Sequence, residues 1–402
     1  MKSVVITGMG VCTAAGASLE ELWQNVLAGH SPAAWRVMAD RSRIAVCAVR
    51  ELPPRPPGAP HLRHVDRSVR LAQTAAAHAW QDAGLDVGAP DPERFGILCG
   101  TSRGPHESFA QSMSELASGR MYPRFAPNTT IASLSGALSA TFGAQGPCMT
   151  VSATCASGAA AIALGAQQIL LGTADVVLAG GAEAPLTDVI LAQLQSARVL
   201  GSSDDPQRTC RPFDRSRNGT VLGEGAAFLV LESLDSAQAR GARVLARLAG
   251  WAVGSESGER TGAAENGGGL CRVMRQSLAL AALPASAIGY INLHGTGTVL
   301  NDRIEPRAVE RLLGSHLASV PCSSTKPVTG HCMGAAAAIE AVITILALRS
   351  GSLPPTINCV EKDPECRLDL ITRAPRARSI DAALSTSSGF WGVNAALVFT
   401  AS

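Results

Sequence analysis

Cys155 stands where a short β-prone run, residues 148–154, becomes a segment rich in alanine, leucine and isoleucine that continues to Gly172. If that segment is a helix, the sulfur lies among free backbone N–H groups at the positive end of the helix dipole, which stabilises a thiolate. The pattern makes Cys155 a candidate nucleophile. Taken alone, the more common interpretation of such a cysteine is a small buried residue that only packs.

Two histidines lie in loops rather than in predicted core segments. His294 follows a buried strand and opens the sequence HGTGT, and His331 comes five residues after Lys326 and just before an alanine-rich helix containing Glu340. Each histidine alone could be structural or surface-exposed. Sites in α/β folds form in loops that follow buried strands, so we expect both to converge on Cys155, together with the glycine turn GFWGVN at residues 389–394.

Ser102 offers a competing nucleophile. It lies in GTSRG, residues 100–104, directly after a predicted strand, and this sequence fits the G-x-S-x-G turn of serine hydrolases. A five-residue pattern with two glycines often arises by chance, so we regard the hydrolase as the less favoured hypothesis.

The elements that must position these residues alternate between strand and helix, which indicates an α/β fold with largely buried sheets. The pattern restarts after Leu234, which suggests an internal duplication: an N-terminal half, 1–233, with the cysteine and a C-terminal half, 234–402, with the histidines. The predicted strands are 3–7, 94–99, 148–154, 175–179, 244–253, 288–293, one near 320, 383–388 and 393–400; the predicted helices are 18–28, 66–83, 134–142, 155–172, 270–281, 303–313 and 335–348.

Composition narrows the classes of function. With 46% apolar residues, 16% charged residues and a net charge of +2, the 402-residue chain can build a large core and has no general affinity for nucleic acid or membrane surfaces. Its eleven cysteines form no CxxC pair and no signal-peptide pattern precedes them, which favours reduced thiols in the cytoplasm and signals no metal site. The uncharged run 125–174 is expected to be deep interior or a subunit interface, not a membrane span.

Five motifs together resemble the β-ketoacyl-ACP synthases, in particular the type II elongating condensing enzymes of the thiolase superfamily. They occur in the order VSATCASGAA, RPFDRSRNGTVLGEGA, HGTGT with a following ND, KPVTGHCMGAAAAIE and GFWGVN, and they extend over essentially the whole chain. The resemblance implies a thiolase fold, with two similar halves in a five-layer αβαβα arrangement. It also implies a homodimer, or a heterodimer with a related chain.

The resemblance further implies the roles of the site residues. Cys155 would accept an acyl chain from acyl carrier protein (ACP) as a thioester, and His294 and His331 would stabilise the enolate formed when malonyl-ACP loses CO₂. Lys326 and Glu340 would orient His331. Phe390 would be a gate, and its N–H and that of Cys155 would form an oxyanion hole. No cofactor and no metal would be needed.

Some positions depart from the family pattern. Arg103 falls near the expected bottom of the acyl pocket and Trp391 replaces a glycine of the gating turn, so we expect a preference for short, or polar and unsaturated, acyl primers, or a pocket completed by a partner subunit. Candidates for docking the acidic ACP are Arg63, Arg67, Arg124 and Arg211. Further departures are Ser152, Ala156, Asn218 and Asn301.

The leading hypothesis is an elongating ketosynthase of fatty-acid or polyketide biosynthesis. An alternative is the ketosynthase subunit of a heterodimer with a catalytically inactive chain-length partner. A third, that the chain is itself the non-condensing partner, conflicts with the presence of Cys155, His294, His331 and Lys326. Chain length, unsaturation and pathway stay open.

Overall fold

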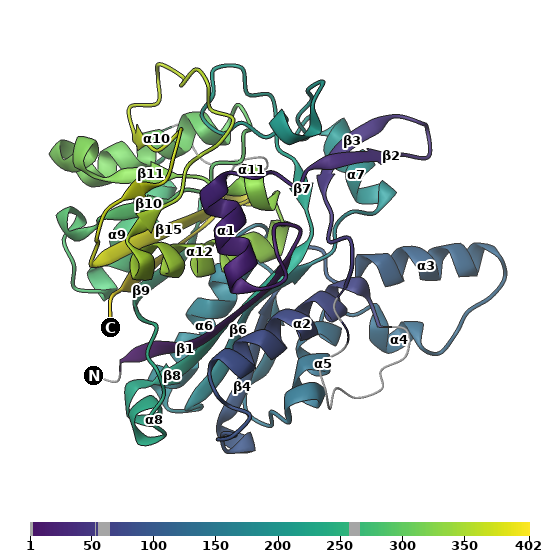
Figure 1. Cartoon of the computed structure of the whole chain (residues 1–402). Coiled ribbons are helices and arrows are strands. Elements are labelled where there is room, and N and C mark those ends of the chain that lie inside the picture. The colour runs from purple at the N-terminus through teal and green to yellow at the C-terminus, as the bar shows by residue number, and fades with distance from the viewer. Residues whose placement is uncertain (1–2, 53, 55–64, 257–265) are drawn as a thin grey trace.

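The computed structural model describes residues 3–52, 54, 65–256 and 266–402 (Figure 1). Its main sheet has eleven strands in the order β13-β11-β10-β15-β16-β9-β1-β8-β6-β4-β5. The strands of the first half are β1 (Val4–Thr13), β4 (Phe95–Gly100), β5 (Cys148–Val151), β6 (Val176–Glu183) and β8 (Gly225–Ser233). Those of the second half are β9 (Ala246–Ser255), β10 (Tyr290–Asn292), β11 (Pro321–Ser323), β13 (Asp369–Leu370), β15 (Ala382–Ser388) and β16 (Val393–Thr400).

The two halves of this sheet repeat one topology. In the first half β5, β4 and β6 pair in parallel, and β6, β8 and β1 pair antiparallel. In the second half β11, β10 and β15 pair in parallel, and β15, β16 and β9 pair antiparallel. The halves join where Val5 and Ile6 of β1 lie opposite Arg247 and Ala246 of β9. The predicted internal duplication is therefore confirmed.

Helices fill three layers around the two halves of the sheet. The helices α2 (Arg67–Asp82) and α5 (Ser133–Phe142) cover the outer face of the first half, and α9 (Gly268–Leu280) and α10 (Asn301–Leu313) cover that of the second. Between the halves lie α6 (Ser157–Leu171) and α12 (Ala336–Ser350), which pack against each other. This is the expected five-layer αβαβα order.

The two central helices are apolar on nearly every side because they face protein in all directions. Both are long and apolar enough to cross a membrane by length and composition, yet the segments Thr154–Leu171 and Met333–Ser350 are 67% and 83% buried within the fold. Gly158 of α6 lies against α12 so closely that a Cβ there would come within 2.8 Å of the Ala338 nitrogen. These helices form the core of the protein.

The predicted helices and strands are present, with shifted ends. The strand β1 continues through Gly8 and Gly10 instead of ending before them, because α2 packs directly on the strand at both glycines. A Cβ would come within 2.3 Å of the Ala79 carbonyl at Gly8 and within 2.1 Å of the Ala75 carbonyl at Gly10. Glycine here permits close approach of a helix, not a turn.

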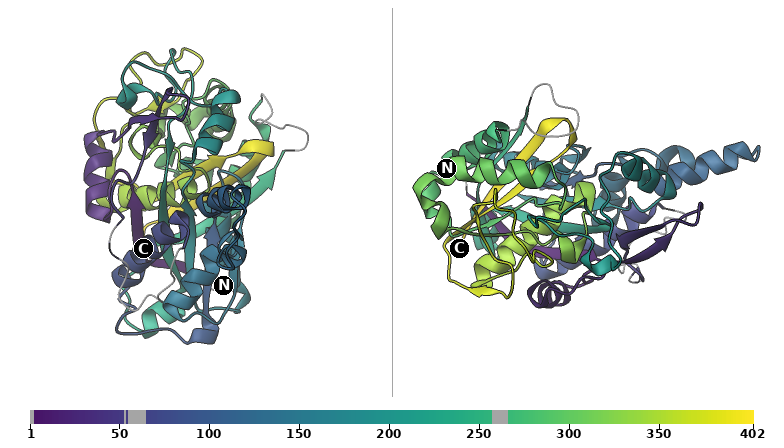
Figure 2. Two further views of the ribbon diagram at one scale, coloured as in Figure 1. Left: turned by 90° about the vertical axis from the view of Figure 1, so that its right-hand side faces the viewer. Right: turned by 90° about the horizontal axis from the view of Figure 1, so that it is seen from above.

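The remaining elements lie around the site or at the surface. They are the helices α1 (Leu19–Ala28), α3 (His106–Ala117), α4 (Phe125–Asn128), α7 (Asp188–Ser196), α8 (Leu234–Ala239) and α11 (Lys326–Thr329), a sheet of β2 (Ala34–Val37), β3 (Arg43–Cys47) and β7 (Leu222–Gly223), and a pair of β12 (Ser352–Leu353) and β14 (Arg376–Ala377). The helix α3 stands away from the body of the molecule (Figures 1 and 2). The predicted loop 53–60 and most of the glycine-rich loop 258–269 lie outside the described residues.

The uncharged run 125–174 is interior only in part. The helix α6 is buried, but Ile131, Cys148 and Met149 are exposed, and β5 is the last strand at its end of the main sheet. An edge strand with apolar side chains is typical of a surface that pairs with another chain. Of the two interpretations offered by the sequence, interior fits α6 and subunit interface fits β5.

Candidate active site

The turn between β5 and α6 presents the candidate nucleophile. Thr154 adopts the left-handed conformation, with φ of 51°, and Cys155 follows it, 8% exposed. Ser157 at the start of α6 holds this turn: its hydroxyl oxygen accepts from the Ala153 N–H at 2.9 Å and lies 2.6 Å from the Thr154 carbonyl. A strained backbone held by its surroundings at a reactive side chain is a recurring feature of functional sites.

The glycine turn between β15 and β16 packs directly on that turn. A Cβ at Gly389 would lie 1.9 Å from the Thr154 hydroxyl and 3.0 Å from the Cys155 nitrogen, so only glycine fits there. Phe390, the next residue, lines the same cavity as Cys155. The predicted meeting of the cysteine with the GFWGVN turn is thus observed.

His294 is fixed at the end of β10 by its backbone and its ring. Its N–H and that of Gly295 donate to the two carboxylate oxygens of Glu305, at 2.7 and 2.8 Å. On the ring, Nδ1 lies 3.3 Å from the Lys326 ammonium. An ammonium can only donate, so Nδ1 is the acceptor and Nε2 carries the hydrogen of the neutral imidazole.

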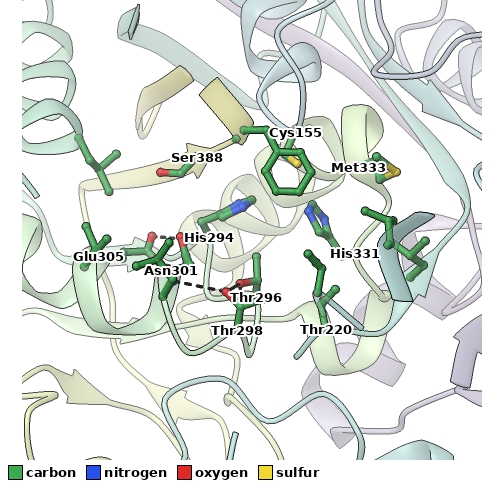
Figure 3. Close-up of a pocket in the computed structure, with 18 residues that line it drawn as sticks. Cys155, Thr220, His294, Thr296, Thr298, Asn301, Glu305, His331, Met333 and Ser388 are labelled. Carbon is green, nitrogen blue, oxygen red and sulfur yellow. Dashed lines mark hydrogen bonds between the residues drawn. The ribbon is translucent and has the colours of Figure 1, made fainter. Parts of the chain in front are cut away.

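His331 lies between α11 and α12. Its N–H donates to the Val221 carbonyl at 2.7 Å, and its carbonyl accepts from the Gly223 N–H at 3.1 Å. Its ring stands at 86° to that of His294, with 5.3 Å between the ring centroids. The Cys155 sulfur and one nitrogen of each ring lie within 4.8 Å of one another, and in Figure 3 the three side chains point toward one another.

Burial keeps both imidazoles neutral. It lowers the pKa of His294 and of His331 well below the usual value of 6.5, and the Lys326 charge lowers both further. Lys326 is itself fully buried and forms an ion pair with Glu340, whose pKa is raised by burial and lowered in turn by Lys326. We expected this pair to orient His331, but of the two histidines it is His294 that lies within hydrogen-bond distance of Lys326 among the described contacts.

Burial acts on the nucleophile in the direction opposite to our expectation. It raises the pKa of Cys155 to about 12, with Lys326 opposing the rise. The N-terminus of α6 also favours the thiolate, but its effect amounts to about 0.3–1 kcal/mol at exposed sites, with up to ~2 in favourable partly buried geometries. The resting side chain is therefore a thiol, and its proton must be accepted when it reacts.

A cavity of about 100 Å³ connects these groups. Its lining combines aliphatic side chains with the hydroxyl groups of Thr220, Thr296 and Thr298, which lie near the histidines in Figure 3. The lining residues are Cys155, Leu194, Val199, Thr220, Leu222, Leu270, His294, Thr296, Thr298, Leu300, Asn301, Ile304, Glu305, His331, Met333, Ser388, Gly389 and Phe390.

Neither Arg103 nor Trp391 is among the described residues that line this cavity. Arg103 is half-buried in the loop after β4, where its N–H donates to Glu183 at 2.9 Å. Trp391 has φ of 65° and is 60% exposed. The expected preference for short or polar primers therefore gains no support from these two side chains.

The proposed docking arginines differ in their environments. Arg67 forms a two-pronged ion pair with Glu224, at 2.8 and 2.7 Å, so it is not a free cation. Arg124 lies over the rings of Tyr122 and Phe125, and Arg211 donates to the carbonyls of Ser216 and Ser202. Arg63 lies outside the described residues.

Two residues that anchor the site, and one exposed arginine beside it, did not emerge from the sequence. Asp302 and Glu305 accept the N–H groups of the HGTGT loop, including those of Thr296 and Gly297 at 3.0 Å each, and so hold the loop that carries His294. Two acids in the first turns of a helix after a glycine loop are a usable signal of such anchoring. Arg198 is exposed beside Val199, a residue of the cavity wall, but no pattern in the sequence distinguishes it.

Cys155, His294 and His331 are also of the types that bind Zn²⁺. The Lys326 ammonium beside His294 opposes a second positive charge. The donor set is better suited to moving protons and stabilising an oxyanion.

Similarity to known proteins covers the whole chain. The beta-ketoacyl synthase N-terminal domain matches residues 1–237, and the C-terminal domain of the same family matches residues 245–360. A putative polyketide beta-ketoacyl synthase 1 from Streptomyces halstedii is 38% identical over 99% of this chain and 98% of its own. The 3-oxoacyl-[acyl-carrier-protein] synthase 2 of Staphylococcus aureus is 35% identical over the same shares.

Solved structures agree with this assignment. The ishigamide ketosynthase/chain length factor superposes with a TM-score of 0.91 at 32% identity, covering 100% of this chain and 99% of that one. The matched domains, the curated relatives and the shared fold thus all point to one family. The chain belongs to the beta-ketoacyl synthase family.

Proposed function

We propose that this chain catalyses the decarboxylative condensation of malonyl-ACP with an acyl group carried on Cys155, in fatty-acid or polyketide biosynthesis. The observation that carries the proposal is the meeting of the Cys155 sulfur with two neutral imidazoles within 4.8 Å. A thiolate is both a good nucleophile and a good leaving group, which an acyl relay requires.

The first half-reaction loads the enzyme. The Cys155 sulfur attacks the thioester carbonyl of acyl-ACP, the carbon–sulfur bond to the carrier breaks, and the acyl group moves to Cys155. The thiol proton must leave Cys155 and reach the departing carrier thiolate. His294 carries its hydrogen on Nε2 and cannot accept there, so His331 is the ring available to move this proton.

The second half-reaction forms the new carbon–carbon bond. The bond to the malonyl carboxylate breaks, CO₂ leaves, and the electron pair moves into an enolate at the thioester oxygen. The Nε2–H of His294 and the neutral ring of His331 beside it face that developing charge. Losing one such donor typically costs about 10²–10³-fold in rate. The enolate carbon attacks the acyl carbonyl, and the bond to the Cys155 sulfur breaks to release a β-ketoacyl-ACP two carbons longer.

Intact-mass analysis after incubation with acyl-ACP tests this function. One acyl adduct is expected on the wild type and on Cys148→Ala, and none on Cys155→Ala. His294→Ala should leave acylation measurable while condensation with malonyl-ACP is lost. An adduct that persists in Cys155→Ala would contradict the assignment.

A second candidate is the ketosynthase subunit of a heterodimer with a chain-length partner. The exposed edge strand β5, with Cys148 and Met149, and the apolar stripe Phe109, Met113 and Leu116 on α3 favour a partner chain of some kind. Light scattering of the purified chain distinguishes the cases: a homodimer favours self-pairing. A monomer that becomes a dimer only when co-expressed with a neighbouring ketosynthase-like gene product favours the heterodimer.

We place the enzyme in the cytoplasm, where its eleven free cysteines would stay reduced.

A further inference from the structure

Four glycines create a junction in which the backbones of neighbouring elements approach one another closely. They are Gly100 at the end of β4, Gly158 in α6, Gly181 in β6 and Gly334 in the short helix Met333–Ala335. A Cβ at Gly100 would lie 2.3 Å from the Ser157 carbonyl, and one at Gly334 would lie 2.3 Å from the Ser102 nitrogen. The nucleophile helix and the start of α12, which come from different halves, therefore meet here.

One carboxylate lies in this glycine junction. Glu183, the last residue of β6, is fully buried. Its Oε1 accepts from the Thr101 hydroxyl at 3.0 Å and from the Arg103 N–H at 2.9 Å, and its Oε2 accepts from the Ser102 N–H at 2.6 Å and from the Gly334 N–H at 2.9 Å. Four donors on two oxygens leave this acceptor fully satisfied.

These contacts lead to both reacting groups. On one side, the Thr101 carbonyl lies 3.1 Å from the Ser157 hydroxyl, which holds the Ala153–Cys155 turn. On the other side, Gly334 lies three positions after His331. It directly follows Met333, a residue of the cavity wall with φ of 45°. The Glu183 carboxylate thus ties the nucleophile turn of one half to the histidine loop of the other.

We propose that Glu183 is a positioning residue for the condensation, which fixes the separation of Cys155 from His331 by binding the loop 101–103 and Gly334 at once. This inference rests on the proposed function. A glutamine cannot replace the carboxylate, because its NH₂ group would face two donors where Glu183 has an acceptor. The side chain makes no contact with the cavity and acts only through the two loops it binds.

Charge gives Glu183 a second, separable effect. The groups whose charges act on Cys155 are Lys326 and Arg103, which favour the thiolate, and Glu183 and Glu340, which oppose it. Removing the Glu183 charge should therefore make the thiol easier to ionise while it loosens the site. A residue with only a structural role would lower thiol reactivity and condensation together.

The test compares Glu183→Gln with its parent in a Cys148→Ser background, which removes the exposed thiol. We expect the pH profile of Cys155 alkylation by iodoacetamide to move to lower pH. We expect the condensation rate of pre-acylated enzyme to fall at least 10-fold with little change in KM for malonyl-ACP. Glu232→Gln is the matched control: Glu232 is equally buried, on β8, and binds Thr7 and Arg240, so its loss should lower the Tm and leave both readouts unchanged.

Glu183→Asp provides a second variant if the glutamine protein does not fold. It keeps the charge but is one methylene shorter and cannot reach both loops, so condensation should fall with no shift of the alkylation profile. Condensation at the wild-type rate in either variant would overturn the proposal, as would a parallel fall of both readouts in Glu183→Gln. If the wild type itself is not acylated at Cys155, the proposed function fails and Glu183 is not the cause.

Discussion

Two opposing forces act on the catalytic sulfur: burial stabilises the thiol, and Lys326 with the N-terminus of α6 stabilises the thiolate. Burial prevails. A protonated resting cysteine suits an enzyme that must not react with stray electrophiles, because ionisation then depends on a neutral imidazole being in place. The cysteine is thus activated by its histidine neighbour during the reaction and not by a lowered pKa of its own.

Alkylation should therefore begin at an exposed cysteine outside the active site and not at Cys155. Cys148 is exposed on β5, whereas Cys155 is buried with its pKa raised to about 12. At pH 7.5 iodoacetamide should label Cys148 first, and labelling of Cys155 should rise only as the pH exceeds the free-thiol value of about 8.5. Peptide mass spectrometry over a pH series measures this, with Cys148→Ser as the control. Cys155 labelling with a midpoint below 8.5 would contradict it.

The buried imidazoles predict a loss of stability in acid. Because the pKa of His294 and of His331 is lowered in the fold, the unfolded chain binds protons below pH 6.5 that the native protein does not. Each histidine should then cost up to about 1.4 kcal/mol of unfolding free energy per pH unit. The unfolding free energy, measured by urea unfolding at several pH values between 7 and 5, should fall less steeply with decreasing pH in His331→Gln than in the wild type. It should fall as steeply as in the wild type in His316→Gln, which alters an exposed ring. Equal slopes in all three proteins would refute the argument.

At the scale of single elements, periodicity located most strands of the main sheet and the helices that pack on it, because buried segments keep their apolar patterns whatever they pack against. The elements near the surface, such as α3, α7 and the β2–β3 pair, were not predicted. Directions of side chains were less accessible. The sequence located Trp391 in the gating turn but not its left-handed backbone, which depends on how β15 and β16 connect. It likewise placed Arg67 at a helix start without revealing Glu224, which lies 157 positions away and meets it only in the fold.

Trp391→Gly tests the gating turn. Glycine adopts a positive φ at no steric cost, so the substitution removes about 1–2 kcal/mol of backbone strain. Glycine also loses more conformational entropy on folding than tryptophan does, which opposes that gain. The Tm should therefore change little, despite the loss of a large ring. Since Trp391 is not in the cavity wall, the rates for acyl-ACP primers from C2 to C16 should keep their order, whereas Phe390→Ala should alter it. A gain for long primers in the glycine variant would mean that the ring does reach the pocket.

At the scale of the whole molecule, the catalytic set is divided between halves that share a continuous sheet. We expect neither 1–233 nor 234–402 to fold alone, because each would expose one central helix and the junction of β1 with β9. Co-expressed halves should co-purify and regain acylation at Cys155. Cooperative unfolding of the isolated 1–233 fragment would show that the boundary separates independent domains.

The outer surface decides how the carrier protein approaches. Arg198 is exposed beside the cavity wall, so Arg198→Glu should raise the KM for acyl-ACP about 10-fold at low salt and less at high salt. Arg349→Glu, at the exposed end of α12, should leave the KM for acyl-ACP unchanged at both low and high salt. An unaltered KM for Arg198→Glu would place docking at Arg124, Arg211 or elsewhere.

The repeated topology also bears on how such a site could arise. The helices α6 and α12 follow the corresponding parallel strand in each half, so the loops before them, which carry Cys155 and His331, occupy equivalent places in the repeated topology. After a gene duplicates within itself, one copy of a loop is free to diverge while the other preserves the fold. A nucleophile and its proton acceptor could then evolve as separate specialisations of a single position, facing each other from the outset.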